Sequence, residues 1–344
     1  MLKKKLNFLK NKRVLLTGFN GFKGSWMSLI LYSLGAKVYG YSLNEKKNKI
    51  NEQAFDLKRI CKSIFYGDIR NYKKLEYFFK KVNPDYCIHM AAQSLVIESF
   101  KRPLETFETN FNGTLNLLEI SRRYGGCPTL IVTSDKCYLN IKKKNLNEND
   151  SLGGDDPYSA SKAVSEVLSY CYIKSYNFKI ATARGGNVIG GGDWNDNRLV
   201  PDIIRSIFLK KKLIIRNLNQ IRPFQHILDV NFSYLKLLKL IISDNKYCSS
   251  FNIGPKKSYK VSKVLNFYKN YIKNNLVFRK EKFKEKSSIF LDTRKSERLG
   301  IKNNINFKST LKLTFEWYQT YFKKNKKIFD FSLKQINNYF KQYV

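Results

Sequence analysis

Residues 13–24 read RVLLTGFNGFKG, an apolar run that passes directly into three glycines. The run predicts a buried strand, and the residues after it predict a helix over 22–34. At such a junction the first glycine permits a tight turn, the second lets backbone approach a pyrophosphate, and the third lets helix and sheet pack closely. The helix N-terminus adds N–H groups that favour phosphate. The stretch therefore predicts a dinucleotide site built from Gly18, Asn20, Gly21, Phe22, Lys23 and Gly24.

The alternation that begins there continues along the first half of the chain. Strands are predicted over 13–17, 37–41, 63–66, 86–90, 129–133 and 178–183, and helices over 22–34, 72–81, 103–123 and 158–175. This order predicts an α/β fold with a Rossmann-type, doubly wound parallel sheet. Shorter elements follow from about residue 186, and a terminal helix is expected over 328–344. We expect a dinucleotide-binding domain over 1–186 and a smaller, mainly substrate-binding region over 187–344, with some segments returning to the sheet.

Composition limits the class of protein. The chain has 344 residues, of which 43% are hydrophobic, and this excludes wholesale disorder. The net charge is +37, but the lysines are spread out, with short runs at 3–5, 142–144, 210–212 and 323–327. We interpret them as a solvated basic surface and expect no specific nucleic-acid partner. A weak anionic partner, such as acidic lipid or nucleic acid, is the alternative.

Histidine and cysteine usage limits metal and redox chemistry. The two histidines, His89 and His226, exclude a three-histidine site, and no metal is expected. The six cysteines form no C-x-x-C pair, which indicates free thiols in a reducing compartment. No apolar run approaches the roughly 20 residues of a membrane span. Residues 1–13 lack the apolar core of a signal peptide, so we expect a cytoplasmic protein.

A tyrosine and a lysine begin the helix predicted over 158–175. Tyr158 and Lys162 form a Y-x-x-x-K pair, and this spacing places both side chains on one helix face. A nearby ammonium favours the phenolate of a tyrosine whose free pKa is about 10. Tyr158 is therefore the candidate base that takes a proton from a hydroxyl, and Lys162 has donors for a cofactor ribose.

The strand predicted over 129–133 runs into Ser134, Asp135 and Lys136. Open α/β sheets bind ligands beyond the carboxyl ends of their strands. Ser134 is placed to hydrogen-bond a reacting oxygen. Asp135 and Lys136 supply an acid and an amine beyond what hydride transfer needs, and this indicates a second proton-transfer step. The alternative is an ion pair in a surface loop.

The remaining dinucleotide contacts are less regular. An acidic residue after the second strand should hold the ribose 2′-hydroxyl, but Ser42 occupies that place and Glu45 comes later. The sequence favours NAD over NADP without deciding between them. Asp68, followed by Ile69, comes after the third predicted strand and is the candidate acceptor for the adenine amino group.

Seven motifs together resemble the extended short-chain dehydrogenase/reductases that act on sugar nucleotides. They are 17–26 (TGFNGFKGSW), 89–93 (HMAAQ), 133–138 (TSDKCY), 152–162 (LGGDDPYSASK), 184–194 (RGGNVIGGGDW), 198–202 (RLVPD) and 221–226 (IRPFQH). The TDKCY form is similar to that of the dehydratases acting on CDP-glucose. Dehydratases for dTDP-glucose or GDP-mannose usually carry Glu in place of Lys136. The similarity covers about residues 13–230 and thins beyond them.

The resemblance implies a redox-neutral elimination on CDP-glucose with NAD as cofactor. Tyr158 would deprotonate the sugar C4 hydroxyl while hydride passes to NAD. A base would remove the C5 hydrogen, an acid would protonate the leaving C6 hydroxyl, and hydride would return to C6. By position Asp135 is the acid and Lys136 the base, and the reverse assignment, with Lys136 stabilising the enolate, stays open. One alternative is a 4,6-dehydratase for another nucleotide sugar, such as dTDP-glucose or GDP-mannose. A 4-epimerase or 4-reductase, which needs only Tyr158 and Lys162, and a non-enzymatic binder are the others.

The resemblance also implies binding residues beyond the catalytic motifs. Ala91, Ala92 and Gln93 would form a cofactor loop positioned by His89, and Asn110 would lie at the cofactor site and brace the active-site strand. The nucleotide sugar would contact Asn187, Arg198, Val200, Arg216, Arg222 and His226. Of these, Arg222 is the first candidate for the diphosphate, and His226 reads more readily as a packing residue. A homodimer through helices 103–123 and 156–175, and a role in deoxysugar synthesis for lipopolysaccharide O-antigen, follow from the same resemblance.

Overall fold

A computed structural model describes residues 6–139, 145–272, 276–279, 289–323 and 327–344. The lysine runs at 3–5 and 142–144, and most of the run at 323–327, lie outside the described residues. Among the described residues no helix combines the length and apolar character that crossing a membrane requires.

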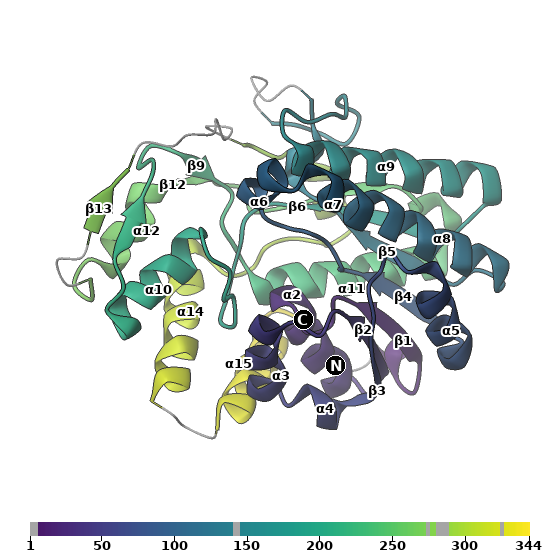
Figure 1. Ribbon diagram of the computed structural model, residues 1–344, viewed down its shortest axis with the longest axis horizontal. Helices are drawn as coiled ribbons and strands as arrows, with labels where there is room; N and C mark the ends of the chain where they lie inside the picture. Colours follow the sequence, from purple (N-terminus) through teal and green to yellow (C-terminus); the bar gives the residue numbers. More distant parts are fainter. Residues whose placement is uncertain (1–5, 140–144, 273–275, 280–288, 324–326) are drawn as a thin grey trace.

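A seven-stranded parallel sheet forms the centre of the molecule (Figure 1). Its strand order is β11-β6-β5-β4-β1-β2-β3, so the chain winds outward in both directions from β1 and β4. The order confirms the predicted doubly wound Rossmann-type fold. The strands are β1 (Arg13–Thr17), β2 (Lys37–Ser42), β3 (Cys61–Tyr66), β4 (Tyr86–His89), β5 (Thr129–Val132), β6 (Ile180–Gly185) and β11 (Ser250–Ile253).

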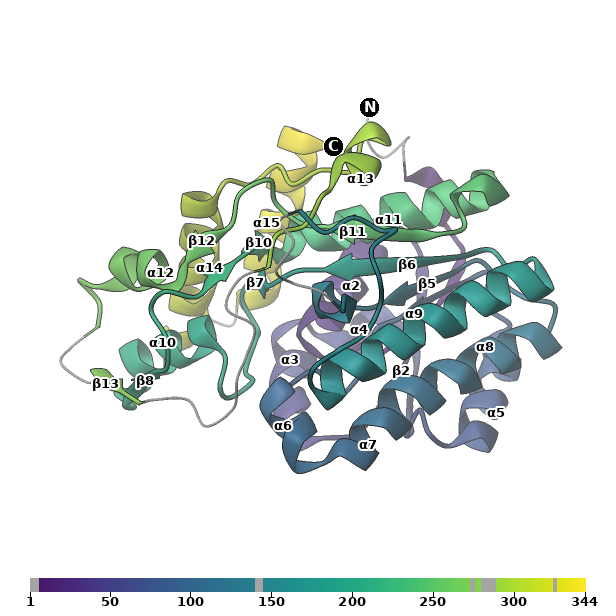
Figure 2. The ribbon, with the colours of Figure 1, turned by 90° about the horizontal axis from the view of Figure 1, so that it is seen from above.

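Helices cover both faces of the sheet (Figure 2). One face carries α5 (Tyr72–Val82), α8 (Gly113–Arg123) and α9 (Pro157–Tyr176), and the other carries α2 (Phe22–Ser33) and α11 (Ile227–Ser243). Buried apolar side chains fill both layers, with Trp26 and Leu235 on the α2–α11 side and Phe78 and Leu117 on the α5–α8 side. Shorter helices border the sheet: α3 (Lys49–Ala54), α4 (Leu57–Ile60), α6 (Val96–Lys101) and α7 (Pro103–Phe107).

The second half of the chain adds a smaller lobe and also returns to the sheet. Strand β11 pairs in parallel with β6, and the terminal helix α15 (Ile328–Tyr343) packs against α2. The division at residue 186 stays a prediction. The lobe contains α10 (Leu199–Leu209), α12 (Val261–Tyr268), α13 (Arg294–Arg298) and α14 (Phe307–Phe322). Its short strand pairs are β7 (Val188–Ile189) with β10 (Gln225–His226), β8 (Leu213–Ile215) with β13 (Leu276–Phe278), and β9 (Ile221–Arg222) with β12 (Tyr259–Lys260).

The helix predicted over 103–123 is interrupted. A π-helical turn over Glu108–Asn112 joins α7 to α8, a feature that the apolar spacing did not predict. The turn contains Asn110, whose buried side chain points into the protein. Such π-turns insert one residue into a helix and occur often at functional sites.

Candidate active site

The glycine turn between β1 and α2 leaves no room for side chains. Gly18 has φ +69°, and a Cβ on it would lie 2.8 Å from the Ala91 nitrogen. A Cβ on Gly24 would lie 2.0 Å from the Gly18 carbonyl oxygen, so this glycine lets α2 pack onto the turn. Helix α2 begins after Gly21, and no side chain of a described residue caps it. A tight turn before an uncapped helix N-terminus fits a dinucleotide pyrophosphate.

Thr17 and His89 hold the predicted cofactor loop against this turn. The Thr17 hydroxyl oxygen accepts from the backbone nitrogens of Met90 and Ala91, each at 3.2 Å, and lies 2.7 Å from His89 Nδ1. His89 Nε2 lies 3.2 Å from the Thr114 hydroxyl. Burial, and then the charge of Lys162, lower the pKa of His89 to about 3, so the ring is neutral. His89 therefore has the geometry of a positioning residue, as the sequence predicted.

The side chain of Asn20 bonds to protein groups, and its predicted cofactor contact stays a prediction. Its side chain is buried, and Nδ2 donates to Glu52 Oε1 at 2.8 Å and to the Leu43 carbonyl at 3.2 Å. The other oxygen of Glu52 accepts from the Tyr66 hydroxyl at 2.8 Å. The side chain of Asn20 thus anchors the glycine turn to the segment after β2. Glu52 was missed because it lies ten residues beyond the end of β2, too far for the spacing rule.

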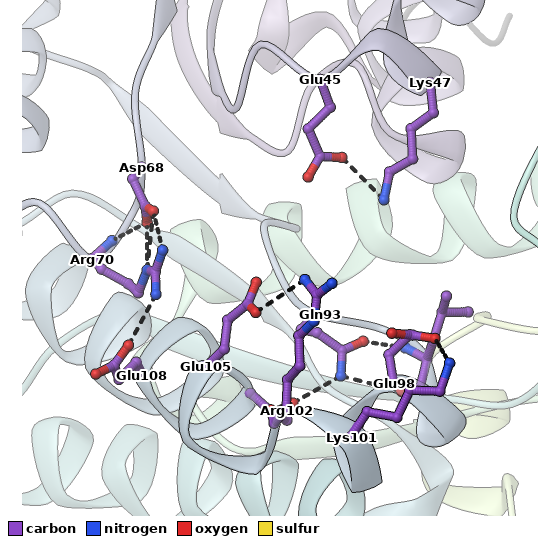
Figure 3. Close-up of polar contacts among 12 residues, drawn as sticks. Glu45, Lys47, Asp68, Arg70, Gln93, Glu98, Lys101, Arg102, Glu105 and Glu108 are labelled. Atoms are coloured by element: carbon purple, nitrogen blue, oxygen red, sulfur yellow. Dashed lines mark hydrogen bonds and ion pairs between the residues drawn. The ribbon is translucent and has the colours of Figure 1, made fainter.

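The side chain of Asn110 bonds to Gln93 and to Ser161, and it makes no bond to β5, the strand that precedes Ser134. Asn110 Oδ1 accepts from the Gln93 nitrogen at 2.9 Å, and Nδ2 donates to the Gln93 carbonyl at 3.0 Å and to Ser161 Oγ at 2.9 Å. The expectation that Asn110 braces β5 is wrong, because its π-turn faces the loop after β4 and α9. The Gln93 amide nitrogen donates to the Thr106 hydroxyl at 2.9 Å (Figure 3).

The residues expected near the adenosine carry ion pairs (Figure 3). Asp68 and Arg70 lie 2.6 Å apart, and Arg70 also reaches Glu108 at 2.9 Å. Burial opposes ionisation of Asp68, but the bonds from Arg70 outweigh it and lower the pKa of the carboxyl. Glu45 pairs with Lys47 at 3.0 Å. Ile69 is buried under α8, where a Cβ on Gly113 would lie 2.6 Å from its Cγ2. The adenine and ribose contacts of Asp68 and Ile69 stay predictions.

Ser134, Asp135 and Lys136 form a buried turn at the carboxyl end of β5. Ser134 Oγ accepts from the Lys136 nitrogen and donates to Asp135 Oδ1, each at 3.2 Å. Asp135 Oδ2 is buried and has no hydrogen-bond partner among the described residues. Burial raises the pKa of Asp135, against the opposing charges of Lys136, Arg222 and Lys23. The carboxyl therefore holds its proton more readily than an exposed aspartate does, which suits a proton donor.

Tyr158 and Lys162 lie one turn apart at the start of α9, and both are buried. Lys162 Nζ donates to the Val132 carbonyl at 3.1 Å, which ties the helix to the end of β5. Burial, then the charge of Lys23, lower the pKa of Lys162 to about 7. Burial raises the pKa of Tyr158 to about 12, although the Ser134 hydroxyl beside it opposes the rise. Burial thus outweighs the lowering of this pKa that the sequence predicted.

Glu166 continues the stripe of Tyr158 and Lys162 one turn further and was missed. Its buried carboxylate accepts from Arg184 Nη2 at 2.9 Å, Thr182 Oγ1 at 2.6 Å, Ser250 Oγ at 2.8 Å and Thr133 Oγ1. Burial opposes its ionisation, but the charge of Arg184 and these hydrogen bonds prevail and lower the pKa of Glu166. One carboxylate thus joins α9 to β5, β6 and β11. The spacing from Lys162 places Glu166 on the same helix face, but its partners come from segments distant in the sequence.

Arg184 extends this network to the far end of the Ser134–Tyr138 turn. Its Nη1 donates to the Tyr138 hydroxyl at 3.0 Å, and that hydroxyl donates to Asn252 Oδ1 at 2.6 Å. The buried Glu166–Arg184 ion pair therefore holds Tyr138, the last residue of the turn, and Thr133, the residue just before it. Arg184 reaches these groups because it lies on β6, which pairs with both β5 and β11.

A cavity of about 260 Å³ opens beside this turn. Residues from both halves of the chain line it, because β7 and β9 bring the second half to the carboxyl end of the sheet. Of the residues predicted from sequence, the lining includes Lys23, Ser134, Asp135, Lys136, Tyr158, Asn187, Arg198, Val200, Arg216 and Arg222. The structure therefore places the predicted proton-transfer groups and five of the six predicted substrate contacts around one space.

Lys23 faces this cavity, although the sequence placed it with the phosphate turn. It occupies the first turn of α2. Burial, followed by the charge of Arg198, lowers the pKa of Lys23 to about 8, while Asp135 and Asp193 oppose the shift. Lys23 therefore lies with Lys136 and Arg198 among the cations that line the cavity.

The cavity arginines are held by neighbouring loops. Arg198 Nη1 lies 3.1 Å from Asp193 Oδ2, and Nη2 donates to Ser94 Oγ at 3.1 Å. Arg198 thereby links the loop after β4 to the loop after β7. Arg216 donates to the Asn197 side chain, and the buried Arg222 donates to the Ile221 carbonyl at 3.1 Å. Guanidinium groups held in this way match the oxygens of a diphosphate.

His226 is absent from the cavity lining, which corrects its inclusion among the substrate contacts. It is fully buried at the N-cap of α11, where Nδ1 accepts from the Leu228 nitrogen at 3.3 Å. Burial lowers the pKa of His226 to about 3. It has the packing role that the sequence also allowed. Within the described ranges no cluster of His, Cys, Asp or Glu could hold a metal ion.

The sequence and fold match known proteins. The CDP-glucose 4,6-dehydratase of Salmonella typhimurium is 39% identical over 262 residues, which cover 73% of each chain. A dTDP-D-glucose 4,6-dehydratase of Dictyostelium discoideum is 27% identical over 257 residues, which cover 71% of this chain and 58% of that protein.

Two solved structures share the fold. A dTDP-glucose 4,6-dehydratase of Streptomyces venezuelae with NAD bound has a TM-score of 0.79 and 23% identity, covering 89% of this chain and 97% of that one. The UDP-glucose 4-epimerase of Thermotoga maritima, with UDP-glucose, has a TM-score of 0.79 and 23% identity, covering 90% and 99%. The family model described as GDP-mannose 4,6 dehydratase matches residues 15–321. With that match over most of its length, the chain belongs to the GDP-mannose 4,6-dehydratase family of nucleotide-sugar enzymes.

Proposed function

We propose that this protein is an NAD-dependent 4,6-dehydratase that converts CDP-glucose to CDP-4-dehydro-6-deoxyglucose and water. The observation that carries the proposal is the cavity that Ser134, Asp135, Lys136 and Tyr158 share with the arginines of the second half. An epimerase needs the tyrosine and lysine only, whereas elimination needs an additional acid and base. The 39% identity to the Salmonella CDP-glucose 4,6-dehydratase supports the same reaction.

NAD supplies a temporary hydride acceptor when it is bound. The glycine turn (Gly18, Gly21 and Gly24) and the α2 N-terminus fit its pyrophosphate, because Cβ atoms at two of these positions would collide with neighbouring backbone. Ala91 and Ala92 belong to the loop held by Thr17 and His89, which suits the nicotinamide half. Lys162 donors suit the nicotinamide ribose.

The first proton transfer belongs to Tyr158. Its phenol stands beside Ser134 at the cavity wall, so Ser134 can hold the sugar C4 oxygen while Tyr158 takes the C4 hydroxyl proton. A phenol with a pKa near 12 is a poor base at neutral pH. A positive charge beside the phenol, which the oxidised cofactor would supply when bound, would lower that pKa.

Lys136 and Asp135 have separate roles in the elimination, as base and as acid. Lys136 removes the C5 proton, which the C4 ketone has made acidic, and the electron pair moves toward the C5–C6 bond. Asp135 gives its proton to the C6 hydroxyl, which leaves as water. The raised pKa of Asp135 and its partnerless buried oxygen support the donor role. In the reverse assignment, which the substitutions below test, Asp135 is the base.

The substrate contacts follow from the cavity lining. Arg198, Arg216 and Arg222 suit the diphosphate, and Asn187 and Val200 suit the sugar and nucleoside beside it. The choice of cytosine rests on the similarity to the Salmonella enzyme and on the TDKCY sequence.

The decisive experiment supplies NAD with CDP-, dTDP-, UDP- and GDP-glucose in separate reactions. CDP-glucose should yield the base-labile chromophore of a 4-keto-6-deoxy sugar. Turnover of another nucleotide sugar would contradict the base preference and keep the mechanism. Run in heavy water, the reaction should place deuterium at C5. A product changed only at C4, without that label, would instead identify an epimerase or reductase.

Assembly and location belong to the same proposal. Apolar side chains stand exposed on α9 and at the start of α7, where Val167 is 56%, Tyr170 62% and Leu104 71% exposed. These residues support a homodimer through helices 103–123 and 156–175, which sedimentation would detect as twice the 40.4 kDa chain mass. The six free cysteines support a cytoplasmic location, and deoxysugar synthesis for O-antigen stays a proposal.

A further inference from the structure

Two cysteines lie in contact near the amino ends of the central strands β4 and β5, whereas the cavity lies beyond the carboxyl ends. Cys87 is buried at the second position of β4, and Cys127 is half-buried in the turn before β5. Their Sγ atoms lie 3.3 Å apart. The Cys87 nitrogen donates to the Pro128 carbonyl at 3.0 Å, so the backbone of the two segments is also joined there. The pair plays no part in the proposed reaction.

Hydroxyl groups surround the sulfur of Cys127. Its Sγ lies 3.9 Å from Ser121 Oγ and 4.0 Å from Thr129 Oγ1. The contact with Cys87 and these hydroxyls lower the pKa of Cys127, although burial opposes the shift. Burial raises the pKa of Cys87. A lowered thiol pKa is a feature of oxidant-sensitive cysteines, and a second thiol in contact with the first can resolve the oxidised product.

We propose that Cys87 and Cys127 form a redox-modification site that peroxide closes to a disulfide. The Cys127 thiolate attacks one oxygen of hydrogen peroxide, so an S–O bond forms, the O–O bond breaks and hydroxide leaves. The Cys87 sulfur then attacks the Cys127 sulfenic acid. The S–S bond forms, the S–O bond breaks, and the oxygen leaves as water with the Cys87 proton. Two thiols are oxidised and one peroxide is reduced to two waters.

The required movement is small. The sulfurs must approach from 3.3 Å to about 2.05 Å, the length of a disulfide bond. Cys87 is held within β4, so the shift falls on the turn that carries Cys127, which lies outside the sheet.

The expected consequence is greater stability with unchanged catalysis. The bond would join residues 40 positions apart and would restrict the unfolded chain. It lies near the amino ends of β4 and β5, whereas the cavity lies beyond their carboxyl ends. The oxidised chain should therefore resist denaturant better and keep the NAD affinity of the reduced chain. The proposal does not depend on the reaction assigned above.

The test treats the full chain with hydrogen peroxide, alkylates the remaining thiols and maps the peptides without reduction. Two of the six thiols should disappear, a peptide linking Cys87 to Cys127 should appear, and dithiothreitol should reverse both. Cys127→Ser should abolish the link and the gain in denaturant midpoint. Cys171→Ser, which removes an exposed cysteine elsewhere, should change neither.

Each other result overturns the proposal. Six thiols surviving peroxide, a link between different cysteines, or direct conversion of Cys127 to sulfinic acid would each contradict it. Cys87→Ser adds an independent check, because Cys127 should then stop at a sulfenic acid that dimedone traps. The mapping of the unsubstituted chain decides the question even where a variant folds poorly.

Discussion

Replacing Glu166 by glutamine tests whether one buried carboxylate holds the active-site scaffold together. The substitution keeps the shape of the side chain but removes its charge, and it places an NH₂ group against some of four donors. The Arg184 side chain, only 3% exposed, then loses its counter-charge. Removing one partner of a buried ion pair costs about 3–5 kcal/mol. At about 2 °C per kcal/mol for a large domain, the melting midpoint should fall by roughly 6–10 °C.

The matched control is Glu119→Gln on α8. Glu119 also pairs with two arginines, Arg122 at 2.7 Å and Arg123 at 3.0 Å, but both arginines are exposed. Exposed pairs contribute about 0–1 kcal/mol each, so this variant, which weakens two of them, should lose at most about 4 °C. Differential scanning calorimetry compares the two. Equal losses in the two variants would refute the claim that burial makes the Glu166 pair decisive.

The pH dependence supplies a second readout of the same substitution. Because the folded-state pKa of Glu166 lies below its unfolded value, its contribution is complete above that unfolded value. The contribution is lost as pH falls through the folded pKa. The stabilities of the Glu166→Gln variant and the unsubstituted protein should therefore converge in acid. A constant gap down to the acid transition would show that packing, and not charge, causes the loss.

Three further outcomes are expected. Because burial lowers the pKa of His89 and His226 to about 3, neither ring signal should titrate in NMR spectra between about pH 5 and 8. The unfolded chain binds both protons below about pH 6.5, so their effect is to lower stability as pH falls beneath that value. Tyr158→Phe should fold normally, by circular dichroism, and lose C4 oxidation, since no other side chain at that position can take the hydroxyl proton. Asp135→Asn should still oxidise C4 but release no water, which the absorbance of reduced cofactor would show. Full activity of that variant would give the acid role to another group.

Spacing patterns within a short stretch of sequence were enough to predict those parts of the fold that depend on contacts between residues close in the sequence. The strand, glycine turn and helix over 13–33 depend on contacts within one unit, and so does the face shared by Tyr158 and Lys162. Glu166 needed the knowledge that β11, which follows α11, returns beside β6 and carries Ser250. The bond from Asn20 to Glu52 could not be predicted either, because the two residues are neighbours only in three dimensions. Contacts between distant segments decide such cases, and no spacing rule encodes them.

Burial also separates the cations proposed to act at the site from the many lysines that reflect only the composition of the chain. With 64 lysines and arginines in the chain, a lysine four residues after a tyrosine is weak evidence by spacing alone. Among the described residues, however, only Lys136, Lys162, Arg184 and Arg222 are almost fully buried cations, and Lys23 is partly buried beside the cavity. Removing an ammonium or guanidinium from water costs several kcal/mol, so a bias that adds lysine to tolerant positions does not place one inside. Three of the four line the cavity or contact the end of β5, and Arg184 holds the turn between them. Most lysines among the described residues thus lie at the surface, whereas the buried cations gather at the cavity and at the turn that supports it.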